Sequence, residues 1–156
     1  SNPTGSAYTK AELEAIAEVV LENDFYVIAD EIYDKLVYDG FEFTSFPTLG
    51  DEIKKKTILI NGASKAYSMT GWRVGFIGAP LWIAKACNKI QGQVTSGTCA
   101  IAQKAAETAM NANPSEIMFM KDIFLKRRDL VLDKISEIEG MKCNVPQGAF
   151  YLFPDF

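Results

Sequence analysis

The sequence contains no histidine among its 156 residues, and it has only three cysteines. Without histidine, the chain itself can supply neither histidine-dependent acid–base catalysis nor an imidazole metal ligand. The cysteines, Cys87, Cys99 and Cys143, are odd in number and far apart, which argues against a secreted disulfide framework and against a zinc site. We therefore expect no metal ion, and a reducing, cytoplasmic compartment.

Long apolar runs and an excess of positive charge are missing as well. No stretch of about 18 apolar residues occurs, so the sequence predicts no membrane span. The net charge is −4, which does not suggest binding to nucleic acid. With 48% apolar and 23% charged residues, the composition is typical of a globular protein with a core of its own. We expect neither a membrane nor a nucleic acid among its partners.

Both ends of the sequence look like cuts. The chain opens on a turn-like segment, Ser1–Gly5, and stops at Phe156 within an apolar run that is typical of an unfinished strand. We therefore expect a central piece of a longer protein, called here the parent protein.

Apolar periodicity and turn residues predict alternating helices and short strands, and therefore an α/β fold. Helices are expected over residues 9–22, 81–91, 99–110 and 116–139, and strands over 25–29, 57–60 and 74–79. The run 25–29 suits a strand buried on both faces of a parallel sheet. Thr9 and Glu12 form a capping-box pattern, and Ser115 is the expected cap of the last helix. Residues 126–128 of that helix are expected on its solvated face.

Polar residues follow two of the expected strands. Asp30 comes directly after 25–29, and Ser64 and Lys65 come shortly after 57–60. In open α/β sheets, ligands bind beyond the carboxyl ends of the strands. Arg73 follows eight residues after Lys65, and its planar guanidinium can hold a phosphate. The pattern predicts a phosphate site with an amine beside it, although Asp30 could instead be a cap and Lys65 a solvated surface residue.

Three motifs, in this order, carry a family resemblance: NPTG at residues 2–5, ADEIYDKLVY at 29–38 and SKAYSMTGWRVG at 64–75. Together they resemble the fold type I pyridoxal-phosphate enzymes, and among these the aspartate aminotransferase-like enzymes of class I/II. The resemblance covers nearly the whole chain. It implies part of a three-layer α/β/α large domain over residues 1–114. Residues 115–156 would then form a linking helix and the truncated start of a small α+β domain, with strands at 142–145 and 148–153.

The resemblance also implies roles around the cofactor ring. Asn2 and Tyr33 would hydrogen-bond the phenolic oxygen of pyridoxal 5′-phosphate, and Asp30 would pair with the ring nitrogen. From the residues alone, NPTG is a tight loop, because proline, glycine and asparagine are turn residues. The alternative for Tyr33 is a packed aromatic.

Lys65 is the implied catalytic residue. It would form a Schiff base with the cofactor and, once released as a neutral amine, act as a general base. Ser64 and Arg73 would bind the phosphate. Many relatives carry a further hydroxyl three residues before the lysine, where this chain has Gly62, so part of the phosphate binding would come from elsewhere.

The implied parent protein is an aminotransferase that exchanges amino groups between amino acids and 2-oxo acids and forms a homodimer. The chain alone is expected to be inactive, because it lacks the glycine-rich phosphate loop, the ring-stacking aromatic and a carboxylate-binding arginine. Two alternatives stay open. One is a related carbon–sulfur lyase or cyclising enzyme, and the other is a non-catalytic ligand-binding α/β piece. The chain contains neither GxxxxGK(S/T) nor GxGxxG, which speaks against a nucleotide-binding version of the latter.

Overall fold

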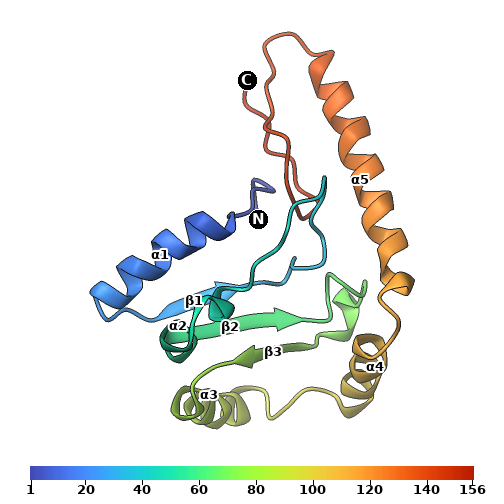
Figure 1. Cartoon of the computed structure of the whole chain (residues 1–156). Helices are drawn as coiled ribbons and strands as arrows, with labels where there is room; N and C mark the ends of the chain where they lie inside the picture. The colour runs from blue at the N-terminus through green and yellow to red at the C-terminus, as the bar shows by residue number, and fades with distance from the viewer. The chain divides into compact units, whose positions relative to one another are not determined.

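The computed structural model in Figure 1 describes the backbone of residues 1–156 and every side chain except that of Ile117. Helices and short strands alternate along the chain, as the sequence predicts. The helices are α1 (Lys10–Glu22), α2 (Asp51–Lys56), α3 (Leu81–Val94), α4 (Ala100–Met110) and α5 (Ser115–Ser136). The strands are β1 (Val27–Asp30), β2 (Thr57–Gly62) and β3 (Gly75–Gly78), and the 3-10 turns are η1 (Phe46–Leu49) and η2 (Thr70–Trp72). Among the described residues, no helix combines the length and apolarity needed to cross a membrane.

The chain forms two compact units. The sheet unit consists of Thr9–Ile32 and Thr44–Ala112, and the tail unit consists of Ser1–Tyr8, Tyr33–Phe43 and Asn113–Phe156. The segment Tyr33–Phe43 therefore packs with the tail unit, although in sequence it lies between β1 and η1. The expected division at residue 114 describes domains of the parent protein and stays a prediction.

β2 is the middle strand of the three-stranded sheet, as Figure 1 shows. β1 runs parallel to it, with Asp30 opposite Ile60. β3 runs antiparallel to it, with Gly62 opposite Gly75. The carboxyl ends of β1 and β2 therefore lie at the same edge of the sheet as the amino end of β3. We call this the carboxyl edge.

A buried apolar cluster packs α1, η1 and α2 against β1. Its buried members are Ala17, Val20, Phe46 and Ile53, and Val27 and Ala29 of β1 pack against them. Exposure alternates along β1, and Ile28 is 67% exposed. The expectation that this strand is buried on both faces is therefore wrong for this chain: Val27 and Ala29 face the packed cluster, whereas Ile28, on the opposite face, is left in solvent.

The two predicted helix caps have different outcomes. Thr9 caps α1 through a full capping box: the Glu12 N–H donates to Thr9 Oγ1 at 3.3 Å, and the Thr9 N–H donates to Glu12 Oε2 at 2.7 Å. The prediction for α5 is wrong, because Ser115 lies inside the helix. Asn113 Oδ1 accepts hydrogen bonds from the Ser115 N–H and hydroxyl instead, both at 3.0 Å.

Among the described residues, the tail unit contains two isolated antiparallel β-bridges, Val37 with Gly148 and Lys142 with Asp155, and no strand. The predicted strands at 142–145 and 148–153 do not form in the described chain. A strand needs a continuous neighbour for its ladder of hydrogen bonds, and each of these segments forms a single β-bridge in the described chain.

Arg128 of α5 organises the tail unit. Its side chain is 9% exposed, so placing it with the solvated residues 126–128 is wrong. Its Nη1 donates to Asp39 Oδ2 at 2.6 Å and to the Pro146 carbonyl at 2.9 Å. The guanidinium also lies over the Tyr38 ring, 5.3 Å from its centroid. Burial raises the pKa of Tyr38 to about 12, against the opposing effect of the arginine charge, so this phenol stays neutral.

Candidate functional site

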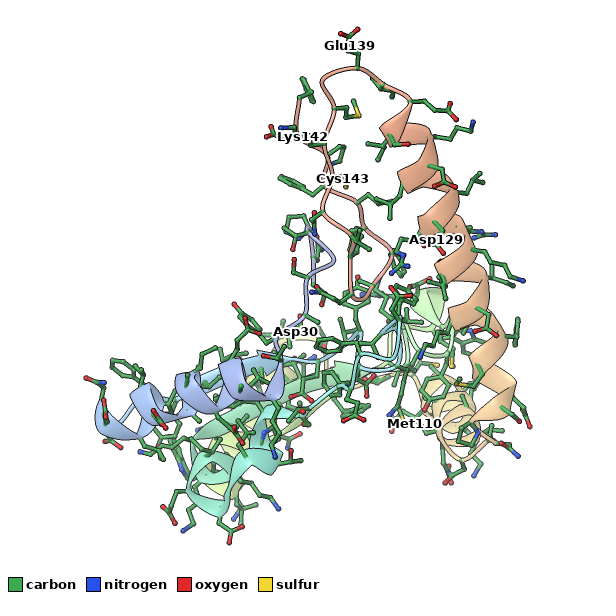
Figure 2. The ribbon with its side chains drawn as sticks, turned by 45° about the horizontal axis from the view of Figure 1, so that its top comes forward. Asp30, Met110, Asp129, Glu139, Lys142 and Cys143 are labelled. Atoms are coloured by element: carbon green, nitrogen blue, oxygen red, sulfur yellow. The ribbon has the colours of Figure 1, made fainter. Side chains whose placement is uncertain are left out.

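Asp30 is the last residue of β1, and Figure 2 labels it at that end of the strand. Its Oδ1 accepts a hydrogen bond from the Ile32 N–H at 3.2 Å, which closes an Asx turn where the chain leaves the sheet. The residue is exposed. Asp30 is therefore a turn-closing residue, and its carboxylate also remains accessible to a cation at the carboxyl edge.

Ser64 and Lys65 lie in a tight turn just beyond β2. The Ala63 N–H donates to the Val74 carbonyl at 3.1 Å, and the Met69 N–H donates to the Ser64 carbonyl at 3.1 Å. Ala63 and Met69 are buried in a cluster with Ala106 of α4. Both Ser64 and Lys65 are half-buried. The turn thus holds the lysine backbone firmly at the carboxyl edge.

Arg73 reaches the same edge because β3 is antiparallel. It lies two residues before that strand begins, and its backbone has a left-handed φ of 56°. Such a conformation is uncommon for a residue other than glycine and persists where the surroundings enforce it. The Arg73 Nη1 donates to the Thr70 carbonyl at 2.8 Å, so the guanidinium folds back over η2 and the rest of its donors stay exposed.

Position 62, three residues before Lys65, is occupied by glycine because the structure leaves no room for a side chain there. A Cβ at this position would lie 2.7 Å from the Val74 carbonyl oxygen and 3.0 Å from the Gly75 Cα. The close pairing of β2 with β3 therefore leaves no room for a hydroxyl-bearing side chain unless β3 shifts.

The other two predicted site residues belong to the tail unit. Asn2 is exposed in the turn at residues 2–4, where the Gly5 N–H donates to the Ser1 carbonyl at 2.5 Å. Tyr33 is buried, at 9% exposure, and its hydroxyl lies 2.5 Å from that of Tyr151. Of the six predicted residues, the structure thus gathers four at the carboxyl edge, namely Asp30, Ser64, Lys65 and Arg73, and it describes Asn2 and Tyr33 within the other unit.

Sequence reasoning missed Glu31. Its Oε1 accepts a hydrogen bond from the Phe46 N–H at 2.8 Å, and its Oε2 accepts one from the Ser45 hydroxyl at 2.6 Å. Glu31 thereby ties the start of η1 to the end of β1, next to Asp30. No local pattern marks this role, because its partners follow 14 and 15 residues later.

The groups at the carboxyl edge are chemically complementary to a ligand with three kinds of function. A guanidinium and a hydroxyl suit a phosphate. A carboxylate suits a protonated nitrogen, and a lysine amine suits a carbonyl carbon.

Comparison with known proteins shows that one family model matches the whole chain. The family model for aminotransferases of class I and II matches residues 1–156. The aspartate/prephenate aminotransferase of Cereibacter sphaeroides is 42% identical over 156 residues, which are 99% of this chain and 39% of that protein. The aspartate aminotransferase of Bacillus subtilis is 43% identical over 155 residues, again 99% of this chain and 39% of the relative.

A solved structure agrees with these relatives. The crystal structure of the aspartate aminotransferase from Rhizobium meliloti superposes with a TM-score of 0.95 at 40% identity, over 99% of this chain and 39% of that one. The chain therefore spans about 39% of the length of the relatives that it matches.

Proposed function

The chain belongs to the class I and II aminotransferases, and we propose that its parent protein is a pyridoxal-phosphate-dependent aminotransferase that exchanges amino groups between amino acids and 2-oxo acids. The observation that best supports this is the meeting of Asp30, Ser64–Lys65 and Arg73 at one edge of the sheet. Because the chain spans only about 39% of its relatives, we expect it to be inactive alone.

The residues at the carboxyl edge fit pyridoxal 5′-phosphate. When bound, this cofactor supplies an electron sink for the substrate carbon. Arg73 would hold the phosphate with its exposed guanidinium donors, and Ser64 would add a hydroxyl. Asp30 would hold a proton on the ring nitrogen, since a carboxylate stabilises a nearby cation.

Lys65 would be the covalent attachment point and the proton carrier. The firmly held turn fixes the backbone that carries this amine, and the half-buried side chain has limited contact with water. As a neutral amine, Lys65 would be able to take the proton from the substrate α-carbon. In the tail unit, Asn2 and Tyr33 are proposed to donate hydrogen bonds to the cofactor's phenolic oxygen.

Two further features of the parent protein belong to this proposal. It would act as a homodimer, as the family resemblance implies. It would work in a reducing cytoplasm, which the odd number of dispersed cysteines favours.

The test uses the full-length parent protein, purified without added cofactor. We expect a yellow protein whose visible absorbance is lost in Lys65→Ala and retained in Lys54→Ala, a control that removes an exposed lysine of α2. Borohydride reduction followed by peptide mass spectrometry should place the cofactor on Lys65. Product analysis with an amino acid and a 2-oxo acid distinguishes amino-group exchange from carbon–sulfur cleavage or cyclisation. An adduct on a different lysine would contradict the assignment.

A further inference from the structure

Tyr33 and Tyr151 form a close hydroxyl pair inside the tail unit, with the two oxygens 2.5 Å apart. Their rings meet edge to face, with centroids 5.7 Å apart and planes at 80°. Phe150 contacts the Tyr33 ring as well, at 5.4 Å and 82°, and stacks on Phe124 of α5 at 5.2 Å. The aromatic cluster therefore fixes both rings, so the hydroxyl pair is not a chance encounter of mobile side chains.

The backbone around Tyr151 is also fixed to the segment that carries Tyr33. The Ala149 N–H donates to the Leu36 carbonyl at 2.8 Å, and the Tyr38 N–H donates to the Gln147 carbonyl at 2.9 Å. The Tyr38 hydroxyl donates a buried hydrogen bond to the Ala149 carbonyl. At Gly148 a Cβ would come within 2.8 Å of the Leu36 carbonyl oxygen, so the two segments touch backbone to backbone. This packing presents Tyr151 to Tyr33 at a set distance.

A phenol has a single proton, so only one member of the pair can donate to the other. If Tyr33 donates to the phenolic oxygen of the cofactor, its own oxygen must accept the proton of Tyr151. A hydroxyl that accepts a hydrogen bond becomes a better donor in turn, because bonds in a chain polarise one another. The direction of the hydrogen bond between Tyr151 and Tyr33 therefore sets the strength of the bond that Tyr33 donates to the cofactor oxygen.

We propose that Tyr151 is a positioning residue that acts through Tyr33, directing the Tyr33 proton toward the cofactor's phenolic oxygen. This rests on the proposed function, because it assumes that the cofactor oxygen is the acceptor of Tyr33. A stronger Tyr33 donor stabilises the deprotonated phenolic oxygen and lowers the pH at which the bound cofactor changes colour.

The experiment is a pH titration of the visible absorbance of the full-length, cofactor-loaded parent protein. Tyr151→Phe, which keeps the ring and removes the hydroxyl, should raise the midpoint of the colour change by about half a unit to one unit. Tyr33→Phe should raise it by at least as much. The double variant should match Tyr33→Phe alone, because the effects of coupled residues are not additive. The control is Tyr8→Phe, which removes a phenol that is 63% exposed and should leave the midpoint unchanged.

Four outcomes are decisive. A wild-type midpoint in Tyr151→Phe overturns the inference, and so does a double variant whose shift is the sum of the single shifts. Should Tyr151→Phe fold poorly, 3-fluorotyrosine at position 151 keeps the ring and makes the hydroxyl a stronger donor. The midpoint should then fall, and an unchanged value overturns the inference. A wild-type protein that binds no cofactor would contradict the proposed function instead.

Discussion

Asp30 and Arg73 lie at the same edge of the sheet, yet our proposal assigns them to opposite ends of the cofactor. The Asp30 carboxylate follows a parallel strand and already closes a turn through Oδ1. The Arg73 guanidinium precedes an antiparallel strand and has one donor engaged with the Thr70 carbonyl. A carboxylate changes the charge state of a ring nitrogen, whereas a guanidinium holds a phosphate in place. Substitutions at the two residues should therefore affect different measured quantities.

Replacement of Asp30 tests the turn-closing role against the proposed chemical one. Asp30→Asn keeps an oxygen for the Ile32 N–H and removes the charge. In the parent protein it should leave thermal stability near wild type and slow single-turnover proton abstraction. An ion pair of about 4 kcal/mol corresponds to a rate loss of up to about a thousandfold. A normal single-turnover rate in Asp30→Asn would reduce this residue to a turn cap.

Replacement of Arg73 should weaken cofactor binding. The loss of a charge-assisted contact costs about 1.5–3 kcal/mol, which corresponds to about a 10- to 150-fold weaker affinity. Arg73→Ala should show this loss in an absorbance titration with pyridoxal phosphate. Arg73→Lys, which keeps the charge but lacks the planar fork, should recover only part of it. Equal affinity in wild type and Arg73→Ala would remove this residue from the phosphate site.

At the scale of elements, the close pairing of β2 with β3 makes a prediction about Gly62. A Cβ there would lie 2.7 Å from the Val74 carbonyl oxygen, so Gly62→Ala should lower the free energy of unfolding by about 1–3 kcal/mol. Gly71 of η2 is the matched control, because a Cβ at that position meets nothing within 4 Å. The thermal midpoint of the parent protein should fall in Gly62→Ala and stay close to wild type in Gly71→Ala. A thermal midpoint that falls further in Gly71→Ala than in Gly62→Ala would show that β2 and β3 can move apart locally without loss of stability.

The start of α1 makes a pH-dependent prediction. Hydrogen bonds from the Thr9 N–H and then from the Thr9 hydroxyl hold the pKa of Glu12 below its ordinary value of 4.5. A carboxyl group whose pKa is lower in the folded state stabilises the fold above its unfolded pKa. That stabilisation is lost as the pH falls through the folded value. Glu12→Gln should therefore be less stable than wild type at pH 7, and the difference should shrink below about pH 4.5.

Thermal unfolding at several pH values measures this difference. Glu18→Gln is the control, because it removes an exposed carboxylate from the same helix outside the capping box. A stability gap for Glu12→Gln that is constant from pH 7 to about pH 3 would contradict the linkage.

The elements that the sequence predicted well depend on local signals. α1 begins one residue after its capping threonine, and β2 and α4 begin within a residue of the expected positions, because caps, periodicity and breakers act over about one helical turn. The sequence identifies Asp30 and Lys65 as candidates because they follow the expected strands 25–29 and 57–60. The direction of β3 was not predictable, since an apolar run reads the same in either direction, and that direction brings Arg73 to the carboxyl edge.

The features that the sequence did not reveal depend on partners far along the chain. Arg128 lies in a basic run whose sequence predicts a solvated helix face. Its ion pair with Asp39, which lies 89 positions away in the sequence, is not visible in that local pattern. The hydroxyl pair of Tyr33 and Tyr151 spans 118 positions. No periodic pattern in the sequence indicates either contact, because each depends on which segments pack together in three dimensions.

At the scale of the whole molecule, the sheet unit leaves large apolar side chains in solvent. They lie on β1, β3 and α3: Ile28 is 67% exposed, Phe76 45%, Ile77 40%, Leu81 69% and Trp82 63%. β1 and β3 are also the outer strands of the sheet, and outer strands present unpaired N–H and C=O groups that can template pairing with another chain. Monomeric proteins rarely expose large apolar patches. Burial of this surface against a second copy is the simplest way for the 156-residue chain to remove it from water.

We therefore predict that this chain, expressed alone, self-associates and binds pyridoxal phosphate only weakly. Light scattering should report an oligomer, and an absorbance titration should show little uptake of cofactor. The double variant Ile28→Lys and Trp82→Gln places polar groups on the exposed apolar surface and should shift the population toward monomer. Lys54→Gln, which changes an exposed polar residue of α2, should not shift it. A monodisperse wild-type monomer that binds the cofactor tightly and transfers amino groups unaided would contradict both parts of the prediction.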